Sequence, residues 1–203
     1  QLMCLKSMIK KNDLGNICHE HIEFYSLKSL KFLFEKNGME IFKIEENDIN
    51  GGSYRIYCRK FRKGSIKLQK EDVLSLMKGF INRVKKNKEM TVRFINKKIK
   101  QNKKVYLYGA STKGNTVLQY YGLNSKKIPF AAERSPEKWG KYTIGTGIKI
   151  ISEKLARNLY PDYFFVTPWG FINEFIKREK KWLKKGGAFI LPFPKFKIIK
   201  FNE

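Results

Sequence analysis

The chain is poor in acidic residues, cysteine, histidine and long apolar runs. It has 18 acidic residues against 43 lysines and arginines, with three cysteines and two histidines among 203 residues. It contains no run of about 18 apolar residues, and its first residues lack the charged-then-apolar order of a signal peptide. Nothing therefore indicates membrane insertion or export, and we expect a cytoplasmic protein with no membrane partner.

The three cysteines are Cys4, Cys18 and Cys58, an odd number without Cys-x-x-Cys spacing. This pattern argues against a disulfide framework and against a zinc site built within the chain. A metal bound by His19 and His21 would need a third ligand, and no further histidine or suitably spaced cysteine supplies one. We expect reduced thiols and no metal held by these residues.

The formal charge of +25 would by itself favour an anionic partner such as nucleic acid. The excess is mostly lysine, however, and it is spread along the chain with abundant Asn, Ile and Phe, as codon bias in an AT-rich genome would produce. Base recognition favours arginine, and single-strand binding needs exposed aromatic rings between the charges. The sequence therefore predicts a lysine-rich solvated surface that suits a small anionic substrate, and disfavours nucleic acid.

Hydrophobic patterning predicts an α/β protein in three sections. Residues 1–62 should contain a short opening helix, a helix at 26–36 that ends at Asn37-Gly38, and two strands joined by a Gly-Gly turn. Those strands are expected at 39–45 and 53–59. Residues 63–103 should form a helical connector with one or two amphipathic helices at 71–101. A basic helix lying on a membrane or on nucleic acid is the alternative for that segment.

Residues 104–203 are predicted to form a compact α/β domain. Alternating strands and helices imply a mostly parallel sheet. The expected strands are at 105–108, 128–132, 148–151, 163–166 and 188–191, and the expected helices at 115–121 and 171–183.

A glycine-rich turn, Gly109 to Gly114, follows the first of these strands. A strand, a turn and a helix N-terminus present backbone N–H groups and a partial positive charge, which suit a phosphate. The spacing is neither that of the Rossmann fingerprint nor that of a Walker loop, since Lys113 comes before Gly114 and no second Gly-Lys-Ser follows. Phosphate binding and a tight turn that packs the helix on the sheet both stay open.

His19 and His21 flank Glu20 near the start of the chain. If residues 17–22 are extended, both imidazoles point to one side and Glu20 to the other. One imidazole could then face a cleft as a general acid or base, because it titrates near neutral pH and a carboxylate can hold its tautomer. A purely structural pair of histidines is the alternative.

Ordered motifs run along the whole chain. They are NICHEH at 16–21, FYSL at 24–27, GGSYR at 51–55, YGASTKGNT at 108–116, ERSPEKWG at 133–140, YT at 142–143, GT at 145–146, PDY at 161–163, PW at 168–169, GG at 186–187 and LP at 191–192. Together they resemble the second half of the S-adenosylmethionine-dependent C-methyltransferases that act on nucleotide-linked deoxysugars. The resemblance implies the end of a class I methyltransferase sheet, connecting helices and a Rossmann-like C-terminal domain.

The resemblance also implies a reaction and its cofactors. A zinc-binding domain and an S-adenosyl-L-methionine domain would precede this part. The substrate would lose a proton beside its sugar ketone, and the enolate would attack the methyl group of the cofactor. The histidine that matches His21 would be the base, with Glu20 and His19 beside it. Candidate contacts to the nucleotide sugar, with surface charge as their alternative role, are Lys113, Asn115, Glu133, Arg134 and Lys138.

Some positions depart from the family pattern. Cys18 stands where the family often has a tyrosine near the reacting sugar, Ile144 where it has a proline, and Gly170 where it has a histidine. The chain opens on Gln1, and no glycine-rich turn followed by an acid precedes His19. We therefore expect a fragment that is inactive alone. The alternative is a stand-alone nucleotide- or partner-binding α/β module, with a basic nucleic-acid binder as a third hypothesis.

Overall fold

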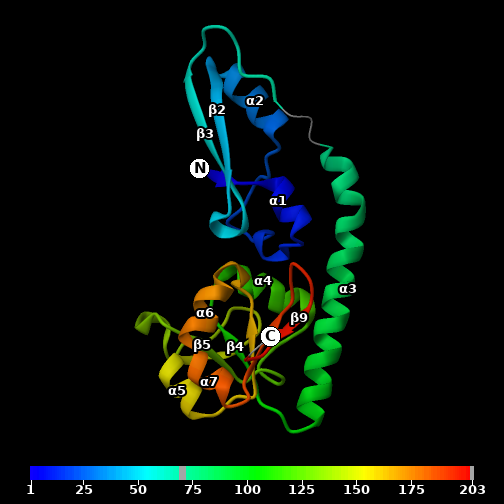
Figure 1. The fold of residues 1–203 in the computed structure, drawn as a ribbon, viewed down its shortest axis with the longest axis vertical. Helices are drawn as coiled ribbons and strands as arrows, with labels where there is room; N and C mark the ends of the chain where they lie inside the picture. The colour runs from blue at the N-terminus through cyan, green and yellow to red at the C-terminus, as the bar shows by residue number, and fades with distance from the viewer. Residues whose placement is uncertain (69–71, 202–203) are drawn as a thin grey trace. The chain divides into compact units, whose positions relative to one another are not determined.

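The computed structural model describes residues 1–68 and 72–201 of the chain. These residues form two compact units (Figure 1). We call residues 1–13 with 19–82 unit 1, and residues 14–18 with 83–203 unit 2. Among the described helices, none is long and apolar enough to cross a membrane.

Unit 1 is built around an antiparallel pair of long strands. Its elements in order are β1 (Leu2–Met3), α1 (Leu5–Lys10), α2 (Leu27–Lys36), β2 (Met39–Asn47), η2 (Ile49–Gly51) and β3 (Ser53–Lys60). β3 lies between β1 and β2 and is antiparallel to both. The predicted helix and both predicted strands are therefore confirmed.

The ends of α2 follow from local hydrogen bonding. Ser26 and Ser29 form a capping box, in which each side chain accepts from the backbone N–H of the other. The helix ends at Asn37, and Gly38 then takes a φ of +69°, as the Asn-Gly pair predicted. Leu27 and Leu30 pack with Cys4 and Tyr54 in the core of this unit.

Unit 2 is a helix-flanked sheet. Its elements in order are η1 (Leu14–Asn16), α3 (Val73–Lys100, from Arg83 on), β4 (Val105–Tyr108), α4 (Thr112–Tyr121), β5 (Phe130–Glu133), η3 (Pro136–Lys138), β6 (Lys149–Ser152), α5 (Glu153–Asn158), β7 (Tyr163–Val166), η4 (Trp169–Phe171), α6 (Ile172–Arg178), α7 (Lys180–Lys184), β8 (Ala188–Leu191) and β9 (Lys197–Ile199).

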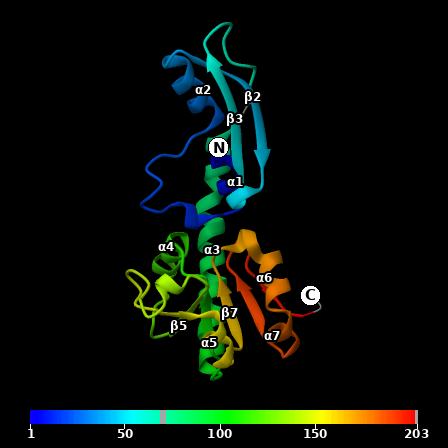
Figure 2. The same ribbon diagram turned by 90° about the vertical axis from the view of Figure 1, so that its left-hand side faces the viewer.

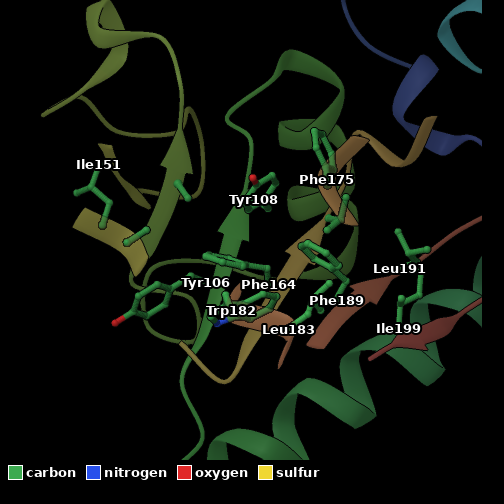
Figure 3. Close-up of a cluster of buried hydrophobic side chains, with 13 residues drawn as sticks. Tyr106, Tyr108, Ile151, Phe164, Phe175, Trp182, Leu183, Phe189, Leu191 and Ile199 are labelled. Carbon is green, nitrogen blue, oxygen red and sulfur yellow. The ribbon is translucent and has the colours of Figure 1, made fainter. Parts of the chain in front are cut away.

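The sheet has the strand order β6-β5-β4-β7-β8-β9, in which all neighbours are parallel except β8 and β9. Counted from β4, this is the order 3-2-1-4-5-6 of a Rossmann fold. Helices α5, α6 and α7 cover one face, where the apolar side chains of β4, β7 and β8 meet (Figures 2 and 3). The predicted α/β class and mostly parallel sheet are confirmed.

A buried carboxylate, Glu179, pairs with a partly exposed arginine, Arg157, on the same face. The Glu179 side chain, which is 1 % exposed, accepts hydrogen bonds from the Tyr108 hydroxyl at 2.8 Å and from Arg157 at 2.6 Å. Tyr108 also contacts the rings of Phe164 and Phe175, with centroids 4.9 Å apart in both cases (Figure 3). A buried carboxylate needs such partners, since desolvation without them is costly.

Several predicted bounds needed correction. The helix after β4 begins at Thr112 rather than 115, because Ser111 caps it. The helix predicted at 171–183 is two helices, which part at Glu179. Helix α5 and the edge strand β9 were not predicted. The connector contains one long helix, α3, and Glu71, where that helix was predicted to begin, lies outside the described residues.

Candidate functional site

A cavity in unit 1 brings together part of the predicted catalytic group. It has a volume of about 470 Å³ and is lined by Leu2, Met3, Glu20, His21, Ile22, Glu23 and Tyr25. Its residues come from β1 and from the loop that leads into α2 (Figure 2). His21 is partly exposed, and its ring meets the ring of Phe24 edge-on with centroids 6.4 Å apart. An imidazole and a carboxylate, Glu20, therefore line the same cavity.

The backbone before His21 is not extended, so the condition for placing both imidazoles on one side is not met. Residues 17–20 form bends and a turn, and the alternation of side chains expected for a strand does not apply to them. His19 is exposed and is not among the residues that line the cavity. Cys18 is buried, at 8 % exposure, within the segment that belongs to unit 2. The structure thus places Glu20 with His21, and leaves His19 outside the cavity.

Tyr25 and Glu23 line the same cavity and were not singled out from the sequence. The hydroxyl of Tyr25 donates a hydrogen bond to the Glu23 carboxylate. This hydrogen bond, with burial and the charge of Glu23, raises the pKa of the Tyr25 phenol above its usual value. In the sequence, Tyr25 is distinguished only as part of the FYSL motif, and the sequence analysis assigned no function to that motif.

The predicted nucleotide contacts lie in unit 2, around the turn after β4. This turn stands where Rossmann folds bind nucleotides, at the carboxyl end of the first strand. Gly109 has a φ of +83°, and Gly114 lies so close to Thr167, the residue after β7, that a Cβ at position 114 would be 2.6 Å from Oγ1 of Thr167. Gly109, Ser111 and Gly114 have the spacing of the three glycines of the Rossmann fingerprint, with serine at the second position, so the prediction that this spacing differs from the fingerprint was wrong.

Glu133, at the end of β5, occupies this turn with its own carboxylate. Oε2 accepts from the Ala110 N–H at 2.8 Å, and Oε1 accepts from the N–H groups of Arg134 at 2.8 Å and Ser135 at 3.0 Å. Burial raises the pKa of Glu133, but the N–H groups of Ser135 and Ala110 and the charge of Lys138 outweigh it, so the pKa is lowered overall. Lys138 also donates to the Ala110 carbonyl at 2.9 Å.

The remaining candidates differ in how they are held. Arg134 is exposed and pairs with Glu174 at 3.6 Å. Lys113 and Asn115 lie in the first turns of α4, and no hydrogen bond or ion pair holds either side chain within the described residues. Of the five predicted contacts, Glu133 and Lys138 are thus part of the turn's own structure. Lys113, Asn115 and Arg134 are better placed to meet a ligand.

The turn after β4 is closely packed by the protein itself. A Cβ at Gly109 would lie 3.2 Å from Cγ of Pro168, and the Ala110 N–H is already bound to Glu133. The turn of unit 2 therefore does not fit S-adenosylmethionine as it stands. Across residues 1–68 and 72–201, no group of three or more His, Cys, Asp or Glu side chains could hold a metal ion.

Comparisons with known proteins show the family of the chain. A family model described as C-methyltransferase C-terminal domain matches residues 48–194, which is more than half of the chain. The chain is 29 % identical over 207 residues to the C-methyltransferase NovU of Streptomyces niveus. The match covers 96 % of this chain and 49 % of that protein, so the chain spans about half the length of its relative. The chain belongs to the family of proteins with a C-methyltransferase C-terminal domain.

Proposed function

We propose that this chain is part of an S-adenosylmethionine-dependent enzyme that C-methylates a nucleotide-linked keto-deoxysugar. The chain supplies the catalytic base and part of the substrate site. The observation that carries this proposal is the placement of His21 and Glu20 on one cavity of about 470 Å³. A cavity of this size accommodates a sugar-sized ligand.

His21 acts as the general base in this proposal. A proton on the carbon beside a ketone is acidic enough for an imidazole to remove, because the negative charge that develops is delocalised onto the ketone oxygen. The apolar side chains of Leu2, Met3 and Ile22 form part of the cavity wall. Glu20, on the same cavity, is the carboxylate that can orient the ring.

The nucleotide is held by unit 2 in this proposal. Lys113 and Asn115 stand in the first turns of α4, whose N-terminus favours negative charge, and Arg134 lies beside the same turn. Arg134 would exchange its exposed contact with Glu174 for a diphosphate oxygen, since an exposed ion pair contributes less than about 1 kcal/mol.

S-adenosylmethionine supplies the methyl group when it is bound. The turn of unit 2 is filled by Glu133, so we assign the main cofactor site, and the zinc site of the family, to protein outside this chain. From the family resemblance we also propose that residues 1–62 are the end of the methyltransferase domain. Residues 63–103 are then a connector, and residues 104–203 are the C-terminal domain. A cytoplasmic location is part of the proposal.

A methyl-transfer assay tests the proposal. The product of the complete gene is incubated with S-adenosylmethionine labelled in the methyl group and a panel of nucleoside-diphosphate keto-deoxysugars. We expect label on a ring carbon next to the ketone of at least one sugar. Label on oxygen or nitrogen, or no transfer to any sugar while S-adenosylmethionine binds, would contradict it.

A further inference from the structure

The cavity of unit 1 needs a group that stabilises negative charge as well as a base. Removal of a proton beside a ketone moves an electron pair onto the ketone oxygen, and a hydrogen-bond donor aimed at that oxygen is the usual means of stabilising it. Of the side chains that line the cavity in the described part of the chain, three are apolar and two are carboxylates that accept hydrogen bonds when ionised. The remaining two are His21 and Tyr25.

If His21 is the base, its unprotonated nitrogen faces the carbon acid, and the N–H of the neutral ring is on the other nitrogen, which faces away from that carbon and its ketone oxygen. Tyr25 has one phenol hydrogen and keeps it at neutral pH. The geometry points to Tyr25 as the catalytic residue whose hydroxyl donates a hydrogen bond to the substrate's ketone oxygen. This inference rests on the proposed function.

The position of Tyr25 suits this role. Its ring packs against the core cluster of Cys4, Leu27, Leu30 and Tyr54, so the ring is held by the same core that anchors α2. The next residue is Ser26, the N-cap of α2. A donor fixed in this way needs little rearrangement when charge develops on the substrate.

Glu23 holds the Tyr25 hydroxyl before the substrate binds. The phenol donates its hydrogen to the Glu23 carboxylate, and a phenol has only one hydrogen to give. The ketone oxygen must therefore replace Glu23 as the acceptor when the substrate enters. The hydrogen bond to Glu23 raises the pKa of the Tyr25 phenol before the substrate binds, and a phenol without that bond still keeps its proton at neutral pH.

The proton on the carbon goes to the neutral imidazole of His21, the C–H electron pair forms a carbon–carbon double bond, and the carbonyl pair moves to oxygen. Tyr25 donates a hydrogen bond to that oxygen without losing its proton. When bound, S-adenosylmethionine would supply the methyl group to this carbon as the carbonyl re-forms, its sulfur keeping the electron pair of the methyl–sulfur bond, and His21 would release its proton to water.

The test compares Tyr25→Phe with a matched control in the product of the complete gene. Phenylalanine keeps the ring and removes only the hydroxyl. Tyr57→Phe is the control, because the Tyr57 hydroxyl donates to Glu45 at 2.9 Å in the same unit, and neither residue lines the cavity. The readouts are kcat and KM for methyl transfer, the rate of α-proton exchange in deuterium oxide, and the urea midpoint of unfolding.

We expect Tyr25→Phe to lower kcat and the exchange rate together by about 100-fold, the range seen when one oxyanion donor is lost, with KM changed less than about threefold. Tyr57→Phe should retain wild-type rates. Wild-type rates in Tyr25→Phe, alongside an active wild type, would overturn the inference. An inactive wild type would instead contradict the proposed function.

A second variant keeps the inference testable if Tyr25→Phe folds poorly. Incorporation of 3-fluorotyrosine at position 25 retains the ring and the hydroxyl and makes the phenol more acidic. A direct hydrogen bond to the oxyanion predicts that kcat for proton exchange changes by about twofold or more. An unchanged kcat in this variant would overturn the inference, because a tyrosine with a purely structural role is insensitive to the acidity of its phenol.

Discussion

The carboxylate of Glu133 accepts a hydrogen bond of 2.8 Å from the backbone N–H of Ala110, so the end of β5 is bonded to the turn that follows β4. In a Rossmann fold, an acid at the end of the second strand often binds the ribose of a nucleotide. Here the acid at that position, Glu133, accepts hydrogen bonds from backbone N–H groups of the protein itself. Glu133 thus defines the shape of the turn beside which Lys113 and Arg134 are placed.

Replacing Glu133 with alanine should destabilise the protein. The variant leaves three backbone N–H groups, those of Ala110, Arg134 and Ser135, without their acceptor. Loss of charged hydrogen bonds and partial burial of unpaired donors predict a decrease of about 2–4 kcal/mol in the free energy of unfolding. Urea unfolding of the wild type and the variant measures this decrease in the free energy of unfolding. The exposed neighbour Glu137 provides the control, and Glu137→Ala should change stability by less than about 0.5 kcal/mol.

Glu40 should make unit 1 sensitive to acid. Its side chain is fully buried, and its pKa is lowered to about 2 by the backbone N–H of Arg62, the Arg59 side chain and the N–H groups of Lys63 and Gly64. A carboxyl with a lowered folded-state pKa adds stability above its unfolded pKa and loses it as the pH falls towards the folded value.

The stability that ionised Glu40 contributes is therefore lost as the pH falls from about 4.5, the unperturbed pKa of a glutamate, to about 2, the pKa of Glu40 in the folded protein. Thermal unfolding measured across that range should show a smaller slope with pH in Glu40→Gln than in the wild type. Equal slopes in the two proteins would show that Glu40 is not the source of the acid sensitivity.

Gly114 and Thr167 should be energetically coupled. Thr167 is 3 % exposed, and its Oγ1, which has no hydrogen-bond partner within the described residues, would lie 2.6 Å from a Cβ at position 114. Gly114→Ala should cost about 1–3 kcal/mol through overpacking. Thr167→Ala removes the clashing oxygen, so the double variant should lose at least about 0.5 kcal/mol less than the sum of the single variants. Additive losses, measured by urea unfolding, would rule out this contact.

Lys113 and Arg134 should contribute to nucleotide binding. We expect Lys113→Ala and Arg134→Ala each to weaken the affinity for a nucleoside diphosphate about 3- to 10-fold, because each removes one favourable charge near the α4 N-terminus. Isothermal titration at two salt concentrations measures this, and the losses should shrink at high salt. Lys154→Ala, on the exposed side of α5, is the control. An equal effect of all three substitutions would indicate general charge attraction rather than a site.

The parts of the fold that the sequence predicted are those set by local pattern. VYLY at 105–108, YFFV at 163–166 and AFIL at 188–191 are continuous apolar runs, which are typical of buried parallel strands. Asn37-Gly38 marks the end of α2 for an equally local reason. Strand β9 was missed because it is a short edge strand that starts at an exposed lysine, Lys197.

The features that were missed depend on contacts between distant segments. The bond between Glu133 and Ala110 joins residues 23 positions apart, and that between Tyr108 and Glu179 joins residues 71 apart. The break between α6 and α7 coincides with the buried Glu179, which no sequence pattern marks. In the cavity, His21 and Glu20 were predicted from their motif. The role proposed for Tyr25 depends on which side chains line the cavity with it, and only the structure shows which ones they are.

Proton exchange by the product of the complete gene, with His21 replaced by alanine, isolates the first chemical step of the proposed reaction. The α-carbon of the nucleotide-linked keto sugar is followed by NMR in deuterium oxide, and S-adenosylmethionine affinity is measured in parallel. We expect His21→Ala to abolish both exchange and methyl transfer while cofactor affinity stays near the wild-type value. Exchange at the wild-type rate in His21→Ala would show that another group is the base.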